Sequence, residues 1–366
     1  MLILQIGNIF SQQDAVQITY YLISFFIIST LLFLIILILH KLYIEKQNKQ
    51  KENYKKIFIE LINNYLIDQN HKIIINNNAL AYETFIEVSI DLLLTISGTS
   101  QTHIKDLNRK LGVIDFYKKQ VDSNIWLKRF QAIEKLGFLK LTEEKEYFLI
   151  LLEKEEKLDI KQKLLWALSL IADEEILFAI TKVLSTLETS SAKFNEYIYF
   201  NIIQEFCSKE IEDRFVSFLN KIKMDESIPQ ILKRDIIEAC GSTTFYKSAK
   251  QIIEYCFIYQ QNPNIKISCI RALGKLMNTQ GEKLIKVALS DIDWRVRAVA
   301  AQSAEFCSTA IIPDLQKLLA DKEYYVRFNA CKTLSKLGSE AKEILSQELN
   351  SENKLVRDMA HFALKQ

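Results

Sequence analysis

The sequence is poor in residues that interrupt helices. It contains three prolines and eight glycines among 366 residues, and no long stretch alternates apolar and polar residues as a half-buried strand does. Apolar residues nevertheless make up 49% of the chain, which is enough for a large buried core. These features argue against strands and predict an all-α fold.

The chain also lacks the residue patterns of metal sites and of common catalytic centres. No two of the six cysteines form a CxxC pair, the four histidines have no partner at metal or triad spacing, and no glycine-rich phosphate loop is present. We therefore expect no catalytic residue, no cofactor and no metal ligand. The cysteines are expected to be buried, reduced core residues of a cytoplasmic protein. They are Cys207, Cys240, Cys256, Cys269, Cys307 and Cys331.

One apolar run is long enough to cross a bilayer. Ile18 to Leu39 are 22 residues without a charge, which as a helix span roughly 33 Å, the thickness of the hydrocarbon core. A buried core helix seldom lacks every charge over six turns. A cleaved signal peptide would have basic residues before the run and small residues after it, and both are missing. We predict a transmembrane helix over residues 18–39.

The flanks of this run predict its orientation. Residues 41–56 carry six lysines against two acids, whereas residues 1–17 carry one charge, Asp14. Because basic flanks stay in the cytoplasm, we expect a single-pass protein of a bacterial inner membrane with residues 1–17 outside. A periplasmic location for the rest of the chain would require the lysine-rich flank to lie outside.

A short motif recurs every 30 residues near the end of the chain. It reads Val-Arg at Val296-Arg297, Val326-Arg327 and Val356-Arg357, with a small residue four positions after the valine and Leu or Ala eight positions after it. These offsets lie on one helical face, so we expect one buried seam. The expected seam residues are Ala300, Ala330, Leu334, Ala360 and Leu364.

Weaker copies of the motif extend the repeat back to Lys128-Arg129, which gives eight units of two helices each, about sixteen helices, over residues 120–366. One hairpin cannot bury its apolar face alone, so the hairpins are expected to stack. Glycines at or after the ninth position are expected to supply the left-handed turn that ends a helix. They are Gly137, Gly241, Gly274 and Gly338.

The segments Asp293 to Ala301 and Val326 to Gly338 resemble HEAT-like repeats of the short, phycobilisome-lyase type. The likeness is strong over residues 264–366, moderate over residues 120–263 and absent before them. It implies a right-handed α-solenoid, but little about chemistry, because such repeats serve enzymes, adaptors and structural proteins alike. An anchor followed by short HEAT-like units also resembles the plan of bacterial proteins that accompany membrane glycosyltransferases making exopolysaccharide.

Residues 40–119 form the predicted linker region between the anchor and the solenoid. A lysine-rich segment over residues 41–56 leads into an amphipathic helix over 57–67, and residues 70–78 are expected to form a loop. Two further helices are expected over residues 79–96 and 104–111, with a break between them at Ser97 to Ser100. The sequence leaves open whether residues 57–119 are a separate domain or the first solenoid helices.

Basic residues follow the first position of the motif in most repeats. They are Arg129, Lys161, Lys233, Lys266, Arg297, Arg327 and Arg357. Residues 120–366 carry 35 basic and 35 acidic residues, whereas a nucleic-acid surface needs a surplus of positive charge. We therefore expect no nucleic-acid partner and interpret the series as structural. Its members should form exposed pairs with carboxylates at adjacent turns, each contributing about 0 to 1 kcal/mol.

Aromatic residues recur just before the motif. Trp126, Trp294, Tyr324 and Tyr325 are candidate partner-binding residues, although packing over the turns between repeats is the favoured interpretation. The sequence predicts a membrane-anchored cytoplasmic scaffold that binds a membrane-associated protein and is not an enzyme. The alternative is a bilin-lyase-like or other small-molecule enzyme built on the same solenoid. Neither the partner nor the oligomeric state follows from the sequence.

Overall fold

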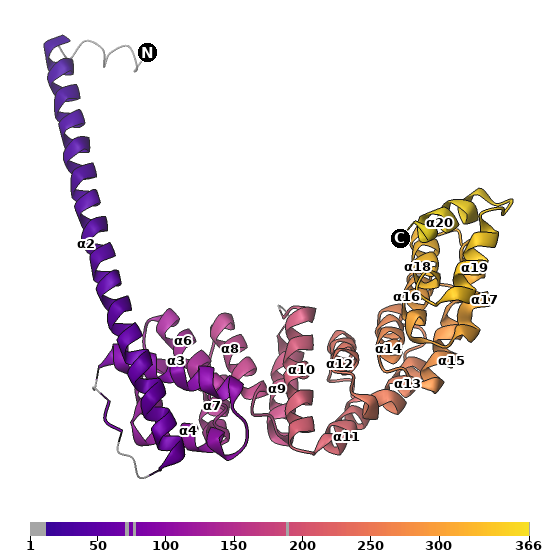
Figure 1. Cartoon of the computed structure of the whole chain (residues 1–366), viewed down its shortest axis with the longest axis horizontal. Coiled ribbons are helices and arrows are strands. Elements are labelled where there is room, and N and C mark those ends of the chain that lie inside the picture. The colour runs from indigo at the N-terminus through magenta and orange to yellow at the C-terminus, as the bar shows by residue number, and fades with distance from the viewer. Residues whose placement is uncertain (1–11, 70–72, 76–77, 188–189, 366) are drawn as a thin grey trace. The chain divides into compact units, whose positions relative to one another are not determined.

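The computed structural model describes residues 12–69, 73–75, 78–187 and 190–365 (Figure 1). Every regular element in these residues is a helix, which confirms the all-α prediction. The chain divides into two compact units, Met1–Lys119 and Gln120–Gln366. His71, most of the predicted loop over 70–78 and the start of the outer segment lie outside the described residues.

The smaller unit is built around one very long helix. Its helices are α2 (Gln12–Ile67), α3 (Ala79–Thr95), α4 (Thr99–Lys110) and the start of α5 (Val113–Val121). The apolar run, the lysine-rich segment and the amphipathic segment, which we predicted as separate parts, are one continuous helix. A break before α4 is present as predicted, with Gly98 in a left-handed conformation (φ 77°), but α4 begins at Thr99, inside the predicted break and before the expected start at residue 104.

The two ends of α2 have different surroundings. Its apolar part is not buried at all, and by length and composition it could cross a membrane, with a mean hydropathy of 3.1. Near its other end, Phe58, Ile62 and Tyr65 are each at most 4% exposed. The ring of Phe58 packs edge-on against Phe85 of α3. The same helix is therefore exposed over its apolar half and part of a core over its amphipathic end.

The larger unit consists of helical hairpins. The first helices of the hairpins form one row and the second helices form another (Figure 1). The first-helix row is α6 (Trp126–Phe138), α8 (Leu158–Ser169), α10 (Ala192–Ser208), α12 (Gln230–Ser242), α14 (Pro263–Lys275), α16 (Trp294–Ser303), α18 (Tyr324–Leu334) and α20 (Lys354–Leu364).

The second-helix row is α7 (Lys145–Lys154), α9 (Glu174–Thr186), α11 (Glu212–Ile222), α13 (Ala249–Ile258), α15 (Thr279–Ala288), α17 (Ile312–Leu318) and α19 (Ser339–Glu348). Short 3-10 turns precede or follow some helices at Thr142–Glu144, Tyr246–Ser248, Ala304–Phe306 and Thr309–Ile311. The described part of this unit thus holds seven hairpins and a single last helix, fifteen α-helices rather than the sixteen we expected.

Side-chain caps set where the first helices begin. Asn262, Asp293 and Asn353 each stand three residues before the first motif position, and their side-chain oxygens accept backbone N–H groups of the first turn. Such a cap satisfies a donor that has no partner within the helix. Because the capping residue keeps its distance from the motif, every such repeat presents the same helical face to its neighbours.

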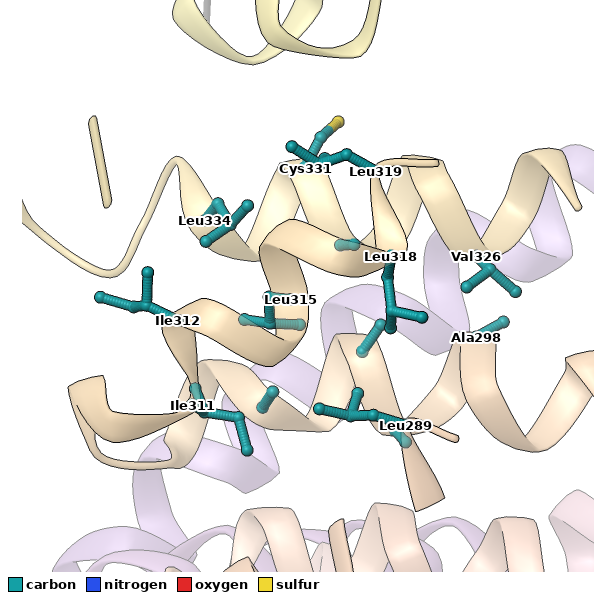
Figure 2. Packing of buried hydrophobic residues seen from close by; sticks show 14 of the residues in the cluster. Leu289, Ala298, Ile311, Ile312, Leu315, Leu318, Leu319, Val326, Cys331 and Leu334 are labelled. Atoms are coloured by element: carbon teal, nitrogen blue, oxygen red, sulfur yellow. The ribbon is translucent and has the colours of Figure 1, made fainter. Parts of the chain in front are cut away.

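The predicted seam is present and continuous across the last repeats. Ala300, Ala330, Leu334 and Ala360 are fully buried. Their cluster also includes Leu315 of α17 and Leu319, which directly follows α17 (Figure 2). Leu364 was also expected in this seam, and that prediction is wrong, because it is 38% exposed. It lies in the last turn of α20, and no helix among the described residues covers it there.

The glycines of the motif have a different role from the one we expected. Gly338 does adopt a left-handed conformation (φ 95°), but Gly137, Gly241 and Gly274 lie inside their helices with ordinary helical angles. A Cβ atom on Gly241 would lie 2.8 Å from the Cα of Ala272 in the next first helix. These three glycines therefore permit close approach of neighbouring helices and do not end them.

Left-handed turns fall three residues after each of these three glycines, and a fourth falls three residues after Cys207; all four use residues other than glycine. They are Lys140 (φ 49°), Glu210 (φ 56°), Thr244 (φ 51°) and Met277 (φ 47°). The N–H of each donates to the carbonyl of the residue three before it, for example Thr244 to Gly241 at 3.2 Å. Each non-glycine residue in this region has a conformational cost that the stacked repeats must offset.

We expect Gly241→Ala to lower the free energy of unfolding by about 2 kcal/mol, because the new methyl group overlaps the backbone of Ala272. Cys207→Ala is the matched control. Cys207 occupies the same repeat position, already carries a Cβ atom and is exposed, so its replacement should change stability by less than about 0.5 kcal/mol. Urea unfolding of the full chain in detergent measures both values. Equal stability of the two variants would contradict the close approach of α12 and α14.

Candidate partner-binding surface

The basic series of the motif connects consecutive repeats through buried ion pairs. In the clearest case Arg297 donates through Nε and Nη2 to the two carboxylate oxygens of Asp321, at 2.7 and 3.0 Å. Its Nη1 donates to the carbonyl of Asp291 at 2.8 Å, in the loop before its own helix. The paired side chains of Arg297 and Asp321 are 11% and 8% exposed, so the expectation of exposed pairs is wrong here.

Equivalent contacts occur in two other repeats. Lys266 donates to Asp291 at 2.7 Å, and Arg129 pairs with Glu155. In each case the carboxylate lies in the loop before the next first helix. These basic residues therefore hold successive repeats together and are largely consumed by that role.

The remaining basic positions lack this carboxylate among the described residues. Lys233 is 3% exposed and donates to the Tyr259 hydroxyl at 2.8 Å, whereas Lys161 is half-buried without an ion pair in the described part of the chain. Arg357 donates to the carbonyl of Ser351 at 2.6 Å, and Arg327 to that of Asp321 at 2.7 Å.

The Arg297 pair shifts the titration of its acid. Burial raises the pKa of the Asp321 carboxyl, but hydrogen bonds from Arg297 and from the Glu323 N–H outweigh burial and hold that pKa below its ordinary value. A lowered carboxyl pKa stabilises the fold above the ordinary pKa of about 3.9. That contribution disappears as the pH falls through the lowered value.

The candidate aromatic residues near the end of the chain form one continuous exposed group. The rings of Trp294 and Tyr325 stack with centroids 6.0 Å apart, and Tyr324 meets Tyr325 edge-on at 5.7 Å. Phe328 continues the contact from Tyr324 to Phe362. We call these five residues the aromatic stack; it spans the first helices α16, α18 and α20.

The stack is accessible to a partner. Trp294 is 38% exposed, Tyr324 52% and Tyr325 63%. Packing over the turns between repeats, the favoured interpretation from sequence, would have buried these rings. Their stacking on one another restricts their rotation, so they present apolar area at little further loss of entropy on binding.

Trp126 belongs to a second aromatic site. It is 51% exposed and lines a hollow of about 670 Å³ on the first helices α6, α8 and α10, which we call the aromatic groove. Lys163 also lines this groove, and its ammonium group lies 2.8 Å from a carboxylate oxygen of Glu134. The same ammonium lies 4.2 Å from the ring centroid of Phe130 and 4.7 Å from that of Trp166. The groove is thus apolar but contains a neutralised charge pair.

A charged hollow of about 480 Å³ follows the aromatic groove on the first helices α10, α12 and α14. Four of its charged residues form two ion pairs, Arg234 with Asp235 and Arg271 with Glu238. Asp235 is 2% exposed and accepts a hydrogen bond from Asn195, and burial raises its pKa. This hollow separates the two aromatic sites along the first-helix row and has little net charge.

Our sequence analysis missed several aromatic residues of both sites. Phe130 and Phe328 stand two positions after the first motif residue, and Trp166 and Phe362 stand six positions after it. Positions two and six are four residues apart and so share a helical face. In the aromatic stack, Phe328 at position two contacts Phe362 at position six of the next repeat. In the aromatic groove, Phe130 and Trp166 hold these two positions and line the same hollow. A search for this second stripe would have found them.

Thiols and imidazoles form no cluster in the described part of the chain that could hold a metal ion. Four cysteines are buried, as expected, whereas Cys307 is half-buried and Cys207 is exposed, which corrects the prediction of uniformly buried thiols. Burial nevertheless raises the pKa of the Cys207 thiol, and Glu212 raises it further, so this thiol is not activated. His103 contacts Gln69 in the smaller unit.

Comparison with known proteins identifies the repeat type. Residues 281–365 match the family described as HEAT repeats. No curated protein matches the chain. Three solved structures are similar, each at 15% sequence identity. An engineered protein aligns with a TM-score of 0.32 over 84% of this chain and 98% of its own, and the Escherichia coli protein YIBA_ECOLI with a TM-score of 0.41 over 74% of this chain and 98% of its own. Human deoxyhypusine hydroxylase in complex with glycerol aligns with a TM-score of 0.25 over 78% of this chain and 97% of its own. The stacked hairpins make the chain an all-α solenoid protein, and its residues 281–365 match HEAT repeats.

Proposed function

We propose that the chain is a membrane-anchored scaffold whose solenoid binds a protein partner at the aromatic stack. The observation that carries the proposal is the exposure of three aromatic rings in mutual contact, Trp294, Tyr324 and Tyr325, across consecutive repeats. Large rigid aromatic side chains dominate the binding energy of protein interfaces. Three members of the basic series, Arg129, Lys266 and Arg297, are occupied in ion pairs between repeats, so the exposed rings are the better anchors.

The apolar part of α2 supports membrane anchoring. It is exposed along its whole length, whereas a core helix of this composition would be buried. The lysines that follow Leu39 favour a cytoplasmic solenoid. The partner would then be associated with the same membrane, for example a complex that makes exopolysaccharide, as the resemblance in overall plan implies.

The topology has a direct test. A reporter that matures only in the cytoplasm should be active when it is fused after Gln366, and a reporter that works only in the periplasm should be inactive there. The same fusions to a chain without residues 1–39 give the control for membrane dependence, because that chain should leave the membrane fraction. Activity of the periplasmic reporter would contradict the orientation.

The partner site is tested by Tyr325→Ala. This change removes the most exposed ring of the stack, and we expect capture of the protein partner from mildly crosslinked membranes to fall about 10-fold or more. Tyr246→Ala is the matched control, because Tyr246 is equally exposed, at 62%, but lies outside the stack. Unchanged capture by the Tyr325 variant would contradict the proposed site. Recovery of a bound chromophore or of turnover, without any protein partner, would favour a small-molecule enzyme.

A further inference from the structure

One position in the series of ion pairs differs from the others beside the aromatic stack. The carboxylate that pairs with Lys266 is Asp291, 25 residues later, and the one that pairs with Arg297 is Asp321, 24 residues later. The residue 24 positions after Arg327 is Ser351. Serine has no carboxylate, so Arg327 cannot form the pair that its neighbours form.

The backbone shows that Ser351 is the true counterpart of Asp321. The N–H of Asp321 donates to Leu318 and that of Ser351 to Glu348, in each case three residues back, at 3.1 Å. The carbonyl of each residue also accepts Nη1 of the arginine six positions later, Arg327 or Arg357. The loops therefore superpose in register, and only the side chain differs.

The missing carboxylate leaves one edge of the Arg327 guanidinium without a partner. Its Nη1 is bonded to the carbonyls of Asp321 and Lys322, at 2.7 and 3.0 Å. Its Nε is buried and has no hydrogen-bond partner among the described residues. In Arg297 the same Nε holds a carboxylate oxygen. A buried donor on a permanent cation is costly to leave unpaired, and an anion relieves that cost best.

The loop that begins at Ser351 reaches the surface, and Arg327 lies next to the aromatic stack. Arg327 itself is 8% exposed, but Ser351 is half-buried and the next two residues, Glu352 and Asn353, are exposed. The guanidinium of Arg327 lies 5.9 Å from the ring centroid of Tyr324. A segment that lies on the stack can therefore direct a side chain toward residue 351.

We propose that Arg327 is the recognition site for a carboxylate of the protein partner, which enters beside Ser351 and takes the place that Asp321 has against Arg297. The partner segment would carry Asp or Glu, which binds Arg327. Next to this acid it would carry an aromatic or aliphatic residue, which packs on Tyr324 and Tyr325. Charge complementarity selects the acid, because the guanidinium fork matches a carboxylate with two hydrogen bonds. This inference rests on the proposed function and adds the chemistry of the partner to it.

The test uses a carboxylate placed in the chain itself. Ser351→Asp should complete the series, pair with Arg327 from within and raise the melting temperature of the detergent-solubilised full chain by about 3 °C. Asparagine has the same shape as aspartate without the charge, so Ser351→Asn should not raise the melting temperature. A melting temperature that is the same in the two variants would show that the free edge of Arg327 does not face residue 351, and would overturn the inference.

The second measurement uses a random library of 12-residue peptides selected on the full chain in detergent. Peptides that bind the wild type should be enriched in Asp or Glu beside an aromatic residue. They should bind Ser351→Asp at least about 10-fold more weakly, because the internal carboxylate competes, and Ser351→Asn without loss. Changing the peptide's Glu to Gln should weaken binding to the wild type equally.

The outcomes separate the inference from the proposed function. Peptides that need Tyr325 but bind Ser351→Asp and the wild type alike would overturn the carboxylate site and leave the aromatic site in place. Peptides that tolerate Tyr325→Ala would contradict the proposed function itself. A rise in melting temperature with Ser351→Asp, but no enrichment of acidic peptides, would mean that water satisfies Arg327, and would also overturn the inference.

Discussion

Replacing Asp321 by alanine is expected to lower the free energy of unfolding by about 3 kcal/mol. The change leaves Nε and Nη2 of Arg297 unpaired in a site where both partners are about nine-tenths buried. Breaking a buried pair by removing one partner typically costs about 3 to 5 kcal/mol, and the retained bonds from Nη1 to Asp291 and Ile292 place this case at the lower end. Urea unfolding of the full chain measures the loss.

Two controls define the cause of this effect. Ser351→Ala changes the equivalent loop residue of the next repeat, where no ion pair exists, and should change stability by less than about 0.5 kcal/mol. The difference between wild type and Asp321→Ala should also shrink as the pH falls below about 4, because protonation removes the same charge. A difference that persists unchanged at pH 2.5 would assign the effect to packing.

Leu334→Ala is expected to cost about 3 kcal/mol, because this side chain is fully buried in the seam and its removal leaves a cavity. Leu364→Ala makes the same change at the same motif position in the last repeat. Leu364 is 38% exposed, so its loss should cost less than about 1 kcal/mol. Similar costs at the two positions would mean that Leu364 is covered in solution, for example by another chain.

Much of the solenoid could be predicted because it depends on helical geometry alone. The offsets of four and eight residues place side chains on one face of any helix, so the burial of Ala300, Ala330 and Leu334 follows from spacing. The exposure of Leu364 does not follow from spacing, because it depends on whether another helix covers that face. Whether a motif residue of the last repeat is buried therefore depends on the helices beside it and not on the motif itself.

Two features could not be read from residue types. Glycine serves both as a helix end and as a point of close approach, and only the structure shows that Gly241 meets Ala272 while Thr244 makes the left-handed turn. Similarly, the sharp change of composition after Leu39 suggested a boundary. Lysine, glutamate and glutamine are good helix formers, so the backbone of α2 continues through it.

The candidate partner site was partly predictable. The recurrence of Trp294 and Tyr324 before the motif drew attention to the edge of the repeats where the exposed rings lie, but ring contacts between repeats depend on the lateral distance between helices. The contact of Phe328 with Phe362 joins positions that differ in the two repeats, and no periodic search at a single position detects it. The position of Arg327 was predictable, and its unpaired edge became visible only beside the paired Arg297.

The continuity of α2 has a mechanical consequence. A helix of 56 residues is about 84 Å long, and its two ends are joined by continuous helical backbone, so they move together. Phe58, Ile62 and Tyr65 lie on the same helix as the apolar segment, and they are buried in the core of the smaller unit. In the proposed topology, a rotation or tilt of the apolar segment within the bilayer would therefore also move the end of α2 that packs against α3, because no flexible loop separates the two.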